Sequence, residues 1–137
     1  MKRILSITVI AIMIIMLASC GKENRIFPTP KAEDVAKIST SKIAISYVYE
    51  IMDKDKIVEI LDVLEKVSDT GKESVNDIPT NVKEPDDIHI VNISYKDDRN
   101  DLMFFVYEDN GEQRVEIPYS GIWKVDSETD ILKLLVE

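Results

Sequence analysis

One feature at the start of the chain constrains its fold most, a long apolar run that ends at the only cysteine. Residues 4–18 carry no charge and follow the cationic start Met1-Lys2-Arg3. About 15 residues make roughly 22 Å of helix, which is less than the about 20 residues that span a bilayer. A cationic start, a short apolar run and then small residues are typical of a secretory signal peptide. The folded domain must therefore come from the residues that follow, and it has to fold without a disulfide.

The end of this run resembles the lipobox of bacterial lipoproteins. Leu17, Ala18 and Ser19 fit the signal cleavage motif, and Cys20 stands where that family carries its lipid. The resemblance implies that residues 1–19 are a cleaved signal peptide and that Cys20 bears a diacylglyceryl group. Since two acyl chains anchor a protein stably, we expect the cell membrane as location, with the chain lipid-anchored on the extracytoplasmic face. The alternative is an uncleaved anchor helix with an incidental cysteine.

The composition excludes several classes of protein. The chain has 137 residues, which predicts one domain, and 17 basic against 26 acidic residues give a net charge of -9. An acidic chain repels phosphates, so a nucleic-acid partner is disfavoured. One cysteine and one histidine cannot build a multi-Cys/His metal site. We therefore expect no metal, no cofactor and no nucleic acid, and an acidic surface favours basic partners.

The chain after the cleavage motif divides into a linker and a domain. Residues 20–33 are polar and contain Pro28 and Pro30, which predicts a lipidated N-terminus followed by a flexible tether. Ile26 and Phe27 are the sizeable apolar residues of this tether, and we expect them to pack on the domain edge or to touch lipid headgroups. Residues 34–137 are expected to form a single α+β domain.

Hydrophobic periodicity predicts the elements of this domain. Strands are expected over 35–38 and 42–51, followed by a helix that begins at Asp53 and ends near Gly71. This helix is expected to bury one apolar stripe, Ile57, Ile60, Leu61 and Leu64. Further strands are expected over 88–95, 102–107, 113–119 and 122–125, with Asn110-Gly111 as a hairpin turn and Ser127 as the cap of a last helix. Alternation along 113–119 predicts that Arg114 and Glu116 face solvent. This order predicts an α+β fold, an antiparallel sheet of four to five strands with two helices packed on one face.

No combination of residues in the sequence indicates a catalytic centre. His89 is the only histidine and lies in a predicted strand, without a Gly-x-Ser-x-Gly turn. In the acidic turn 96–101, Leu102 breaks the alternation that a calcium loop needs, and no glycine follows. We therefore expect no catalytic residue and no enzyme. Two alternatives stay open, an inhibitor or protective lipoprotein and a cell-envelope hydrolase that uses carboxylates. The hydrolase needs a cleft near Glu116, Asp77 or His89 and a carboxyl group with a raised pKa.

Two segments stand out as candidate binding surfaces. The first is the loop 72–86, which contains Asn76 and Asp77, and loops of this length are often functional. The second is the turn 116–123, which places Tyr119 and Trp123 around a glycine, and aromatic side chains with a polar group often anchor interfaces. We therefore treat Asn76, Asp77, Tyr119 and Trp123 as candidate binding residues. The alternative is that Tyr119 and Trp123 close the core where the sheet meets the last helix.

The same two segments resemble a family of small Gram-positive bacterial lipoproteins of unknown function. The resemblance covers residues 35–135 and rests on the motifs Ser-Val-Asn-Asp-x-Pro and Glu-x-Pro-Tyr-x-Gly-Ile. The matching residues are Ser74, Val75, Asn76, Asp77, Pro79, Glu116, Pro118, Tyr119, Gly121 and Ile122. Trp123 stands where a tyrosine is expected, and Ile117 where a glutamine is expected. The family implies no activity, so we expect a membrane-anchored, non-catalytic binding module for an unknown protein or envelope partner.

Overall fold

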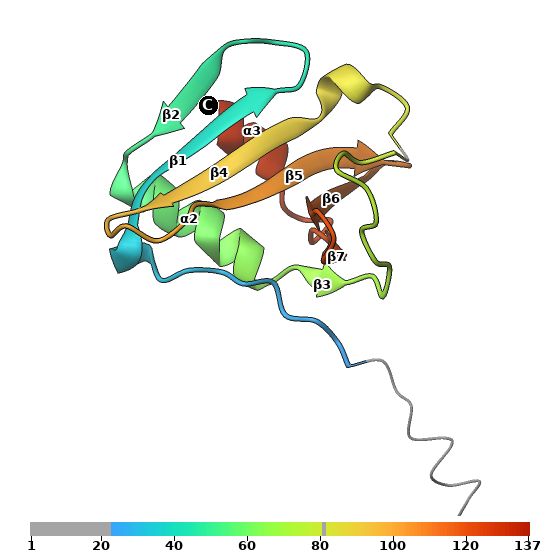
Figure 1. Cartoon of the computed structure of the whole chain (residues 1–137), viewed down its shortest axis with the longest axis horizontal. Coiled ribbons are helices and arrows are strands. Elements are labelled where there is room, and N and C mark those ends of the chain that lie inside the picture. The colour runs from blue at the N-terminus through green and yellow to red at the C-terminus, as the bar shows by residue number, and fades with distance from the viewer. Residues whose placement is uncertain (1–22, 81) are drawn as a thin grey trace, which may run out of the picture.

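A computed structural model describes residues 23–80 and 82–137 of the chain, and Figure 1 shows their arrangement. The described residues form one antiparallel sheet of seven strands in the order β2-β1-β4-β5-β6-β7-β3. The strands are β1 Val35–Lys42, β2 Val48–Ile51, β3 Ser68–Asp69, β4 His89–Tyr95, β5 Leu102–Asp109, β6 Glu112–Ile117 and β7 Gly121–Lys124. The helices are the 3-10 turns η1 Ala32–Asp34 and η2 Pro85–Asp87 and the α-helices α2 Lys54–Glu65 and α3 Ile131–Val136. Leu17, Ala18, Ser19 and Cys20 lie outside the described residues.

The expected sheet of four to five strands with two helices is wrong. The part of the chain that the structure describes has seven strands, and its fold is mostly β. The only long helix in that part is α2 with 12 residues, since α3 has 6 residues. The difference arises at β1, β2 and β3, where the strand boundaries are not those that the apolar pattern predicts.

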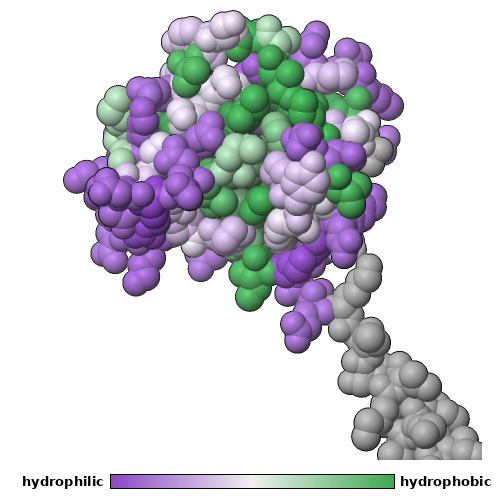
Figure 2. All heavy atoms as spheres, viewed as in Figure 1, coloured by the Kyte–Doolittle hydropathy of each residue, from purple (hydrophilic) through white to green (hydrophobic). Residues whose placement is uncertain are grey.

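The predicted strand over 42–51 is two elements. β1 continues through residues 39–41 as far as Lys42, and β2 begins at Val48 and pairs with β1 as a hairpin. The residues between them form the turn, where the side chains of Ile45 and Tyr47 are 53% and 71% exposed. The alternation of apolar residues predicted a strand here, but no neighbouring element covers these side chains. Figure 2 shows apolar surface at this end of the molecule.

The predicted helix that follows Asp53 is confirmed, but it ends earlier than expected. The Asp53 side chain accepts a hydrogen bond from the backbone N–H of Lys56 at 2.9 Å, which caps the helix. The expected stripe of Ile57, Ile60, Leu61 and Leu64 is buried. The helix stops at Glu65 because the next residues form β3, which pairs with β7. Gly71 then turns the chain with a φ of +71° and does not end a helix.

The two faces of the sheet are covered by different parts of the chain. In Figure 1, α2 and α3 lie behind the sheet, and the segment between β3 and β4 passes in front of it. The main core includes Phe104, Val115 and Trp123 and packs against both helices. On the opposite face, Ile88, Phe105 and Tyr107 form a second buried cluster. The Asn110-Gly111 hairpin between β5 and β6 is confirmed, with φ angles of 52° and 79°. No helix of the described residues is long and apolar enough to cross a bilayer.

The start of the described chain packs into the main core. Phe27 is 4% exposed, and its ring centroid lies 5.4 Å from that of Phe104 and 5.3 Å from that of Trp123, edge to face in both cases. Its neighbour Ile26 is 90% exposed. The sequence leaves open whether these two residues pack on the domain or touch lipid headgroups, and Phe27 packs on the domain. Part of the segment expected to be a tether is therefore part of the fold.

We expect the substitution Phe27→Ala to destabilise the domain by about 3–5 kcal/mol, because it removes a fully buried aromatic ring. The adjacent substitution Ile26→Ala is the matched control and should change the stability by less than about 0.5 kcal/mol. Urea unfolding followed by tryptophan fluorescence measures both free energies of unfolding. Equal effects at the two positions would contradict the packing of this segment.

Candidate functional site

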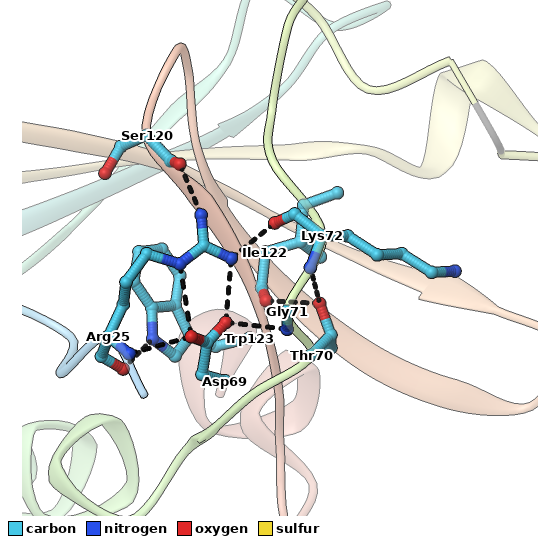
Figure 3. Close-up of polar contacts among 8 residues, drawn as sticks. All are labelled: Arg25, Asp69, Thr70, Gly71, Lys72, Ser120, Ile122 and Trp123. Atoms are coloured by element: carbon cyan, nitrogen blue, oxygen red, sulfur yellow. Dashed lines mark hydrogen bonds and ion pairs between the residues drawn. The ribbon is translucent and has the colours of Figure 1, made fainter. Parts of the chain in front are cut away.

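Arg25 joins three segments of the chain at one edge of the sheet (Figure 3). Its guanidinium binds the Asp69 carboxylate through Nη2 at 2.8 Å and Nε at 3.1 Å, and its backbone N–H donates to the same carboxylate at 2.7 Å. The guanidinium also donates to the carbonyl oxygen of Ser120 at 2.7 Å and to that of Lys72 at 2.6 Å. The N-terminal segment, the start of the β3–β4 loop and the β6–β7 turn are thus bound to one side chain, which we call the Arg25 clamp.

The clamp depends on close packing around Gly121. A Cβ atom at this position would lie 2.8 Å from Nη1 of Arg25 and 2.9 Å from the ring of Trp123, which is closer than real Cβ contacts. Trp123 donates its ring N–H to the carbonyl oxygen of Arg25 at 3.0 Å, and the Arg25 guanidinium lies 5.7 Å from the centroid of its ring. The glycine of the Pro-Tyr-x-Gly-Ile motif therefore makes room for the clamp.

A buried polar group links the β3–β4 loop to the face of the sheet that it covers. The two carboxyl oxygens of Glu116 accept hydrogen bonds from Ser74 Oγ at 2.6 Å and from the Tyr107 hydroxyl at 2.7 Å. Glu116 is 4% exposed, although the alternation along β6 predicted that it points to solvent. That prediction is wrong because the loop covers this face. Burial, together with the hydrogen bond to Glu116, raises the pKa of Tyr107 far above its ordinary value.

A second contact between the same two segments lies at the surface. The Tyr119 hydroxyl donates to Oδ1 of Asp77 at 2.6 Å, and this hydrogen bond raises the pKa of Tyr119. Tyr119 is 67% exposed and has a φ of +58°, an uncommon backbone conformation for a residue other than glycine. Such conformations persist only where the surrounding structure enforces them. The exposed ring of Tyr119 is thus held in a fixed position.

The structure therefore brings the two motif segments together, but it places the four candidate residues differently. Asp77 and Tyr119 form the surface contact, and Asn76 is exposed beside them, with its amide 3.4 Å from the Thr80 hydroxyl. Trp123 is 1% exposed and belongs to the core. Arg25 and Asp69 were not singled out from the sequence, since no local pattern relates two residues 44 positions apart.

A larger cavity lies elsewhere in the described part of the chain, beside His89 at the other end of the sheet. It has a volume of about 400 Å³ and lies between the η2 segment, the β5–β6 hairpin and α3. Lys42 Nζ and the Asp87 carboxylate lie 2.8 Å apart at its wall, and this pair lowers the pKa of Asp87. Burial lowers the pKa of His89, which leaves its imidazole uncharged at neutral pH. No cluster of three or more metal-ligating side chains occurs within 23–80 and 82–137.

Comparison with known proteins identifies a family but no activity. Residues 23–124 match the family model DUF5301, whose description is "Domain of unknown function (DUF5300)". The match covers more than half of the chain, so the chain belongs to this family, and it begins before Arg25, as the folded segment does. No curated protein is detectably similar.

One solved structure is similar to this chain over most of its length. It is described as the NMR structure of the protein from Ruminococcus gnavus, with a TM-score of 0.59 and 27% sequence identity. The match covers 81% of this chain and 98% of the other. Family and structure together support a protein of unknown function, and neither provides a catalytic residue.

The Arg25 clamp predicts a specific sensitivity to acid. Hydrogen bonds from Arg25 and from the Gly71 N–H hold the pKa of Asp69 well below its ordinary value of 3.8. A carboxyl group with a lowered pKa stabilises the fold above its ordinary pKa, and this contribution is lost as the pH falls towards the lowered value. We therefore expect Asp69→Asn to lower the melting temperature at pH 6 and the difference from wild type to shrink below pH 3.8. Asp98→Asn, in an exposed turn, is the control, and a difference that is constant with pH would contradict the ion pair.

Proposed function

We propose that this member of the DUF5301 family is a lipoprotein that is anchored through Cys20 on the extracytoplasmic face of the cell membrane and acts as a non-catalytic binding module. The main support is the position of the Arg25 clamp, five residues after the lipobox cysteine. A fold that begins so soon after an anchor is suited to a domain held at the membrane surface. The lipobox resemblance of Leu17, Ala18 and Ser19 supports the anchor itself.

The short distance along the chain determines how the domain would sit. Five extended residues reach at most about 18 Å, so the edge of the sheet that carries Arg25 would stay close to the lipid headgroups. Phe27 and the clamp fix this edge because their partners lie in β3, β5 and β7. The domain would then present one orientation to a partner and would not rotate freely on a long linker.

The proposed contact surface consists of Asn76, Asp77 and Tyr119. These residues are exposed, and the Tyr119 hydroxyl is held by Asp77, so binding would cost little ordering of side chains. Trp123 lies in the core, with its ring against Gly121 of the turn that carries Tyr119. A basic partner suits the surface, since Asp77 and the net charge of -9 are negative.

The carboxyl groups named for the hydrolase alternative support a non-catalytic role. Both oxygens of Glu116 are hydrogen-bonded inside the protein, where no substrate reaches them. Asp77 accepts a hydrogen bond from the Tyr119 hydroxyl at the surface. Beside His89, the third residue named, the nearby carboxyl group is that of Asp87, and Lys42 lowers its pKa, whereas a general acid needs a raised pKa. The binding role therefore fits these groups better than hydrolysis does.

The lipid anchor is tested by the substitution Cys20→Ala. We expect the wild-type chain to sediment with membranes and to begin at a Cys20 whose mass includes a diacylglyceryl group. Because the variant has no thiol to carry a lipid, it should leave the membrane fraction or keep its first 19 residues. Ser19→Ala keeps a small residue at the cleavage motif and should behave as wild type. A native chain that begins at Met1 with an unmodified thiol would refute the anchor.

The contact surface is tested with the double variant Asn76→Ala/Tyr119→Phe. It removes an amide and a hydroxyl from the surface and leaves Trp123 in the core. In cells of the source organism, chemical cross-linking of the wild-type chain should yield a specific adduct. The amount of this adduct should be at least about tenfold lower for the variant, which corresponds to a loss of about 1.4 kcal/mol in binding free energy. Tyr95→Phe removes a hydroxyl from another part of the sheet and is the control. If the melting temperature falls but the adduct remains, these residues serve the fold.

A further inference from the structure

One end of the sheet face that carries the helices is left open. α3 has only 6 residues, so it does not extend over the ends of β1 and β4. Two cavities lie in this open region, and both are lined by Lys42 and His89. The two cavities adjoin at Lys42 and His89, between α3, the β1–β2 hairpin and the segment before β4, and we call them together the His89 groove.

The smaller compartment of the groove is mainly apolar. It has a volume of about 110 Å³. Besides Lys42 and His89, which also line the larger compartment, its lining residues are Thr40, Ser41, Ile45, Tyr47, Tyr49 and Val136. This volume is well below the roughly 300 Å³ of a small-molecule pocket, so it suits a single side chain. Ile45, Tyr47 and Val136 are 53%, 71% and 53% exposed at its rim.

The apolar compartment also contains a buried polar atom that has no partner. Thr40 is 3% exposed, and its hydroxyl makes no hydrogen bond within the described part of the chain. Buried hydroxyl groups nearly always have a partner, and leaving one unpaired is unfavourable because its lost hydration is not replaced. A ligand with a hydrogen-bonding backbone group next to an apolar side chain would satisfy both features of this compartment.

The larger compartment is acidic. It has a volume of about 400 Å³, and its lining includes the four carboxylates of Glu84, Asp87, Glu108 and Asp109 but only the two ammonium groups of Lys42 and Lys83. The Lys42 ammonium is already paired with Asp87, and the Arg114 guanidinium lies 3.9 Å from the Asp109 carboxylate. Glu84 and Glu108 then remain against Lys83, and His89 adds no positive charge at neutral pH. The excess of negative charge favours a cationic group in this compartment.

We infer that the His89 groove binds a cationic peptide segment of a partner protein, with one bulky apolar side chain in the Thr40 compartment and an adjacent Lys or Arg side chain in the acidic compartment. Charge complementarity favours this occupant over a second copy of the chain, because two copies with a net charge of -9 repel each other. The exposed β1–β2 turn lies at the opposite end of the molecule from the first described residues (Figure 1). The groove would thus stay accessible on a domain whose Arg25 edge faces the membrane.

This inference goes beyond the proposed function by adding a second binding site, and it is tested with three synthetic peptides and the full chain in a mild nonionic detergent. The first peptide contains Leu-Lys-Arg between glycines. The second replaces Lys-Arg by Glu-Glu, and the third replaces Leu by Ser. We expect only the first peptide to bind, because it alone carries both an apolar and a cationic side chain. In NMR titrations its addition should shift the resonances of Thr40 and His89.

Two substitutions separate the compartments from the rest of the surface. Tyr47→Ser removes an exposed ring from the apolar rim, and Glu108→Lys reverses a charge in the acidic compartment. Each should weaken binding of the first peptide by at least about tenfold. Two control variants lie at distant positions. Ile26→Ser removes an exposed apolar group and Glu59→Lys reverses a charge, and both variants should bind the first peptide as the wild type does. The melting temperatures of all four variants report whether the fold is kept.

The outcomes distinguish the groove from the proposed function. The groove would be overturned if the first two peptides bind equally or if the first peptide does not bind. It would also be overturned if the resonance shifts are confined to residues 76–77 and 119. Concentration-dependent dimers that Tyr47→Ser dissociates would overturn it in favour of a second copy. If the chain stays in the membrane fraction and forms the cross-link that depends on Tyr119, yet binds no peptide, the groove fails and the proposed function stands. Peptide binding by a native chain that begins at Met1 with an unmodified thiol would support the groove and refute the anchor.

Discussion

The Arg25–Asp69 ion pair is the interaction on which the arrangement of this edge depends. Asp69 is the last residue of a two-residue strand, and a strand so short has few ladder hydrogen bonds of its own. Arg25 compensates by binding the Asp69 carboxylate and the carbonyl oxygens of Lys72 and Ser120. Hydrogen bonds to charged groups are stronger than neutral ones, so one side chain can hold a strand, a loop and a turn in place.

The position of the β3–β4 loop follows from this edge. Its first residues are held by Arg25, and its middle is held by the hydrogen bonds of Ser74 with Glu116 and of Asp77 with Tyr119. A long loop without regular structure is normally mobile. Here one buried and one exposed contact fix it across the sheet. Five residues of the two sequence motifs are thereby explained as parts of one packed unit, namely Ser74, Asp77, Glu116, Tyr119 and Gly121. The exposed part of that unit lies in the proposed contact surface.

The sequence was most informative where the structure is local. The Asp53 cap, the stripe from Ile57 to Leu64 and the Asn110-Gly111 turn involve residues within a few positions of one another, and all three are found. The sequence led to wrong predictions of burial where a side chain is covered by a distant segment. Glu116 appeared to face solvent because β6 alternates, and the loop that covers it comes from 42 positions earlier. The turn around Ile45 was predicted as a strand because its apolar residues alternate. In the described residues no element packs over these side chains, so the alternation does not reflect burial.

The sequence separations within the Arg25 clamp determine when it can form. Arg25 lies near the start of the chain, whereas Ser120 and Trp123 lie 95 and 98 positions later. A chain that is synthesised from its N-terminus cannot complete the clamp until β7 has been made. Contacts of such high sequence separation are slow to form, so the attachment of the N-terminal segment is among the last events of folding. Until then Phe27 is without its cover and is accessible to chaperones and proteases.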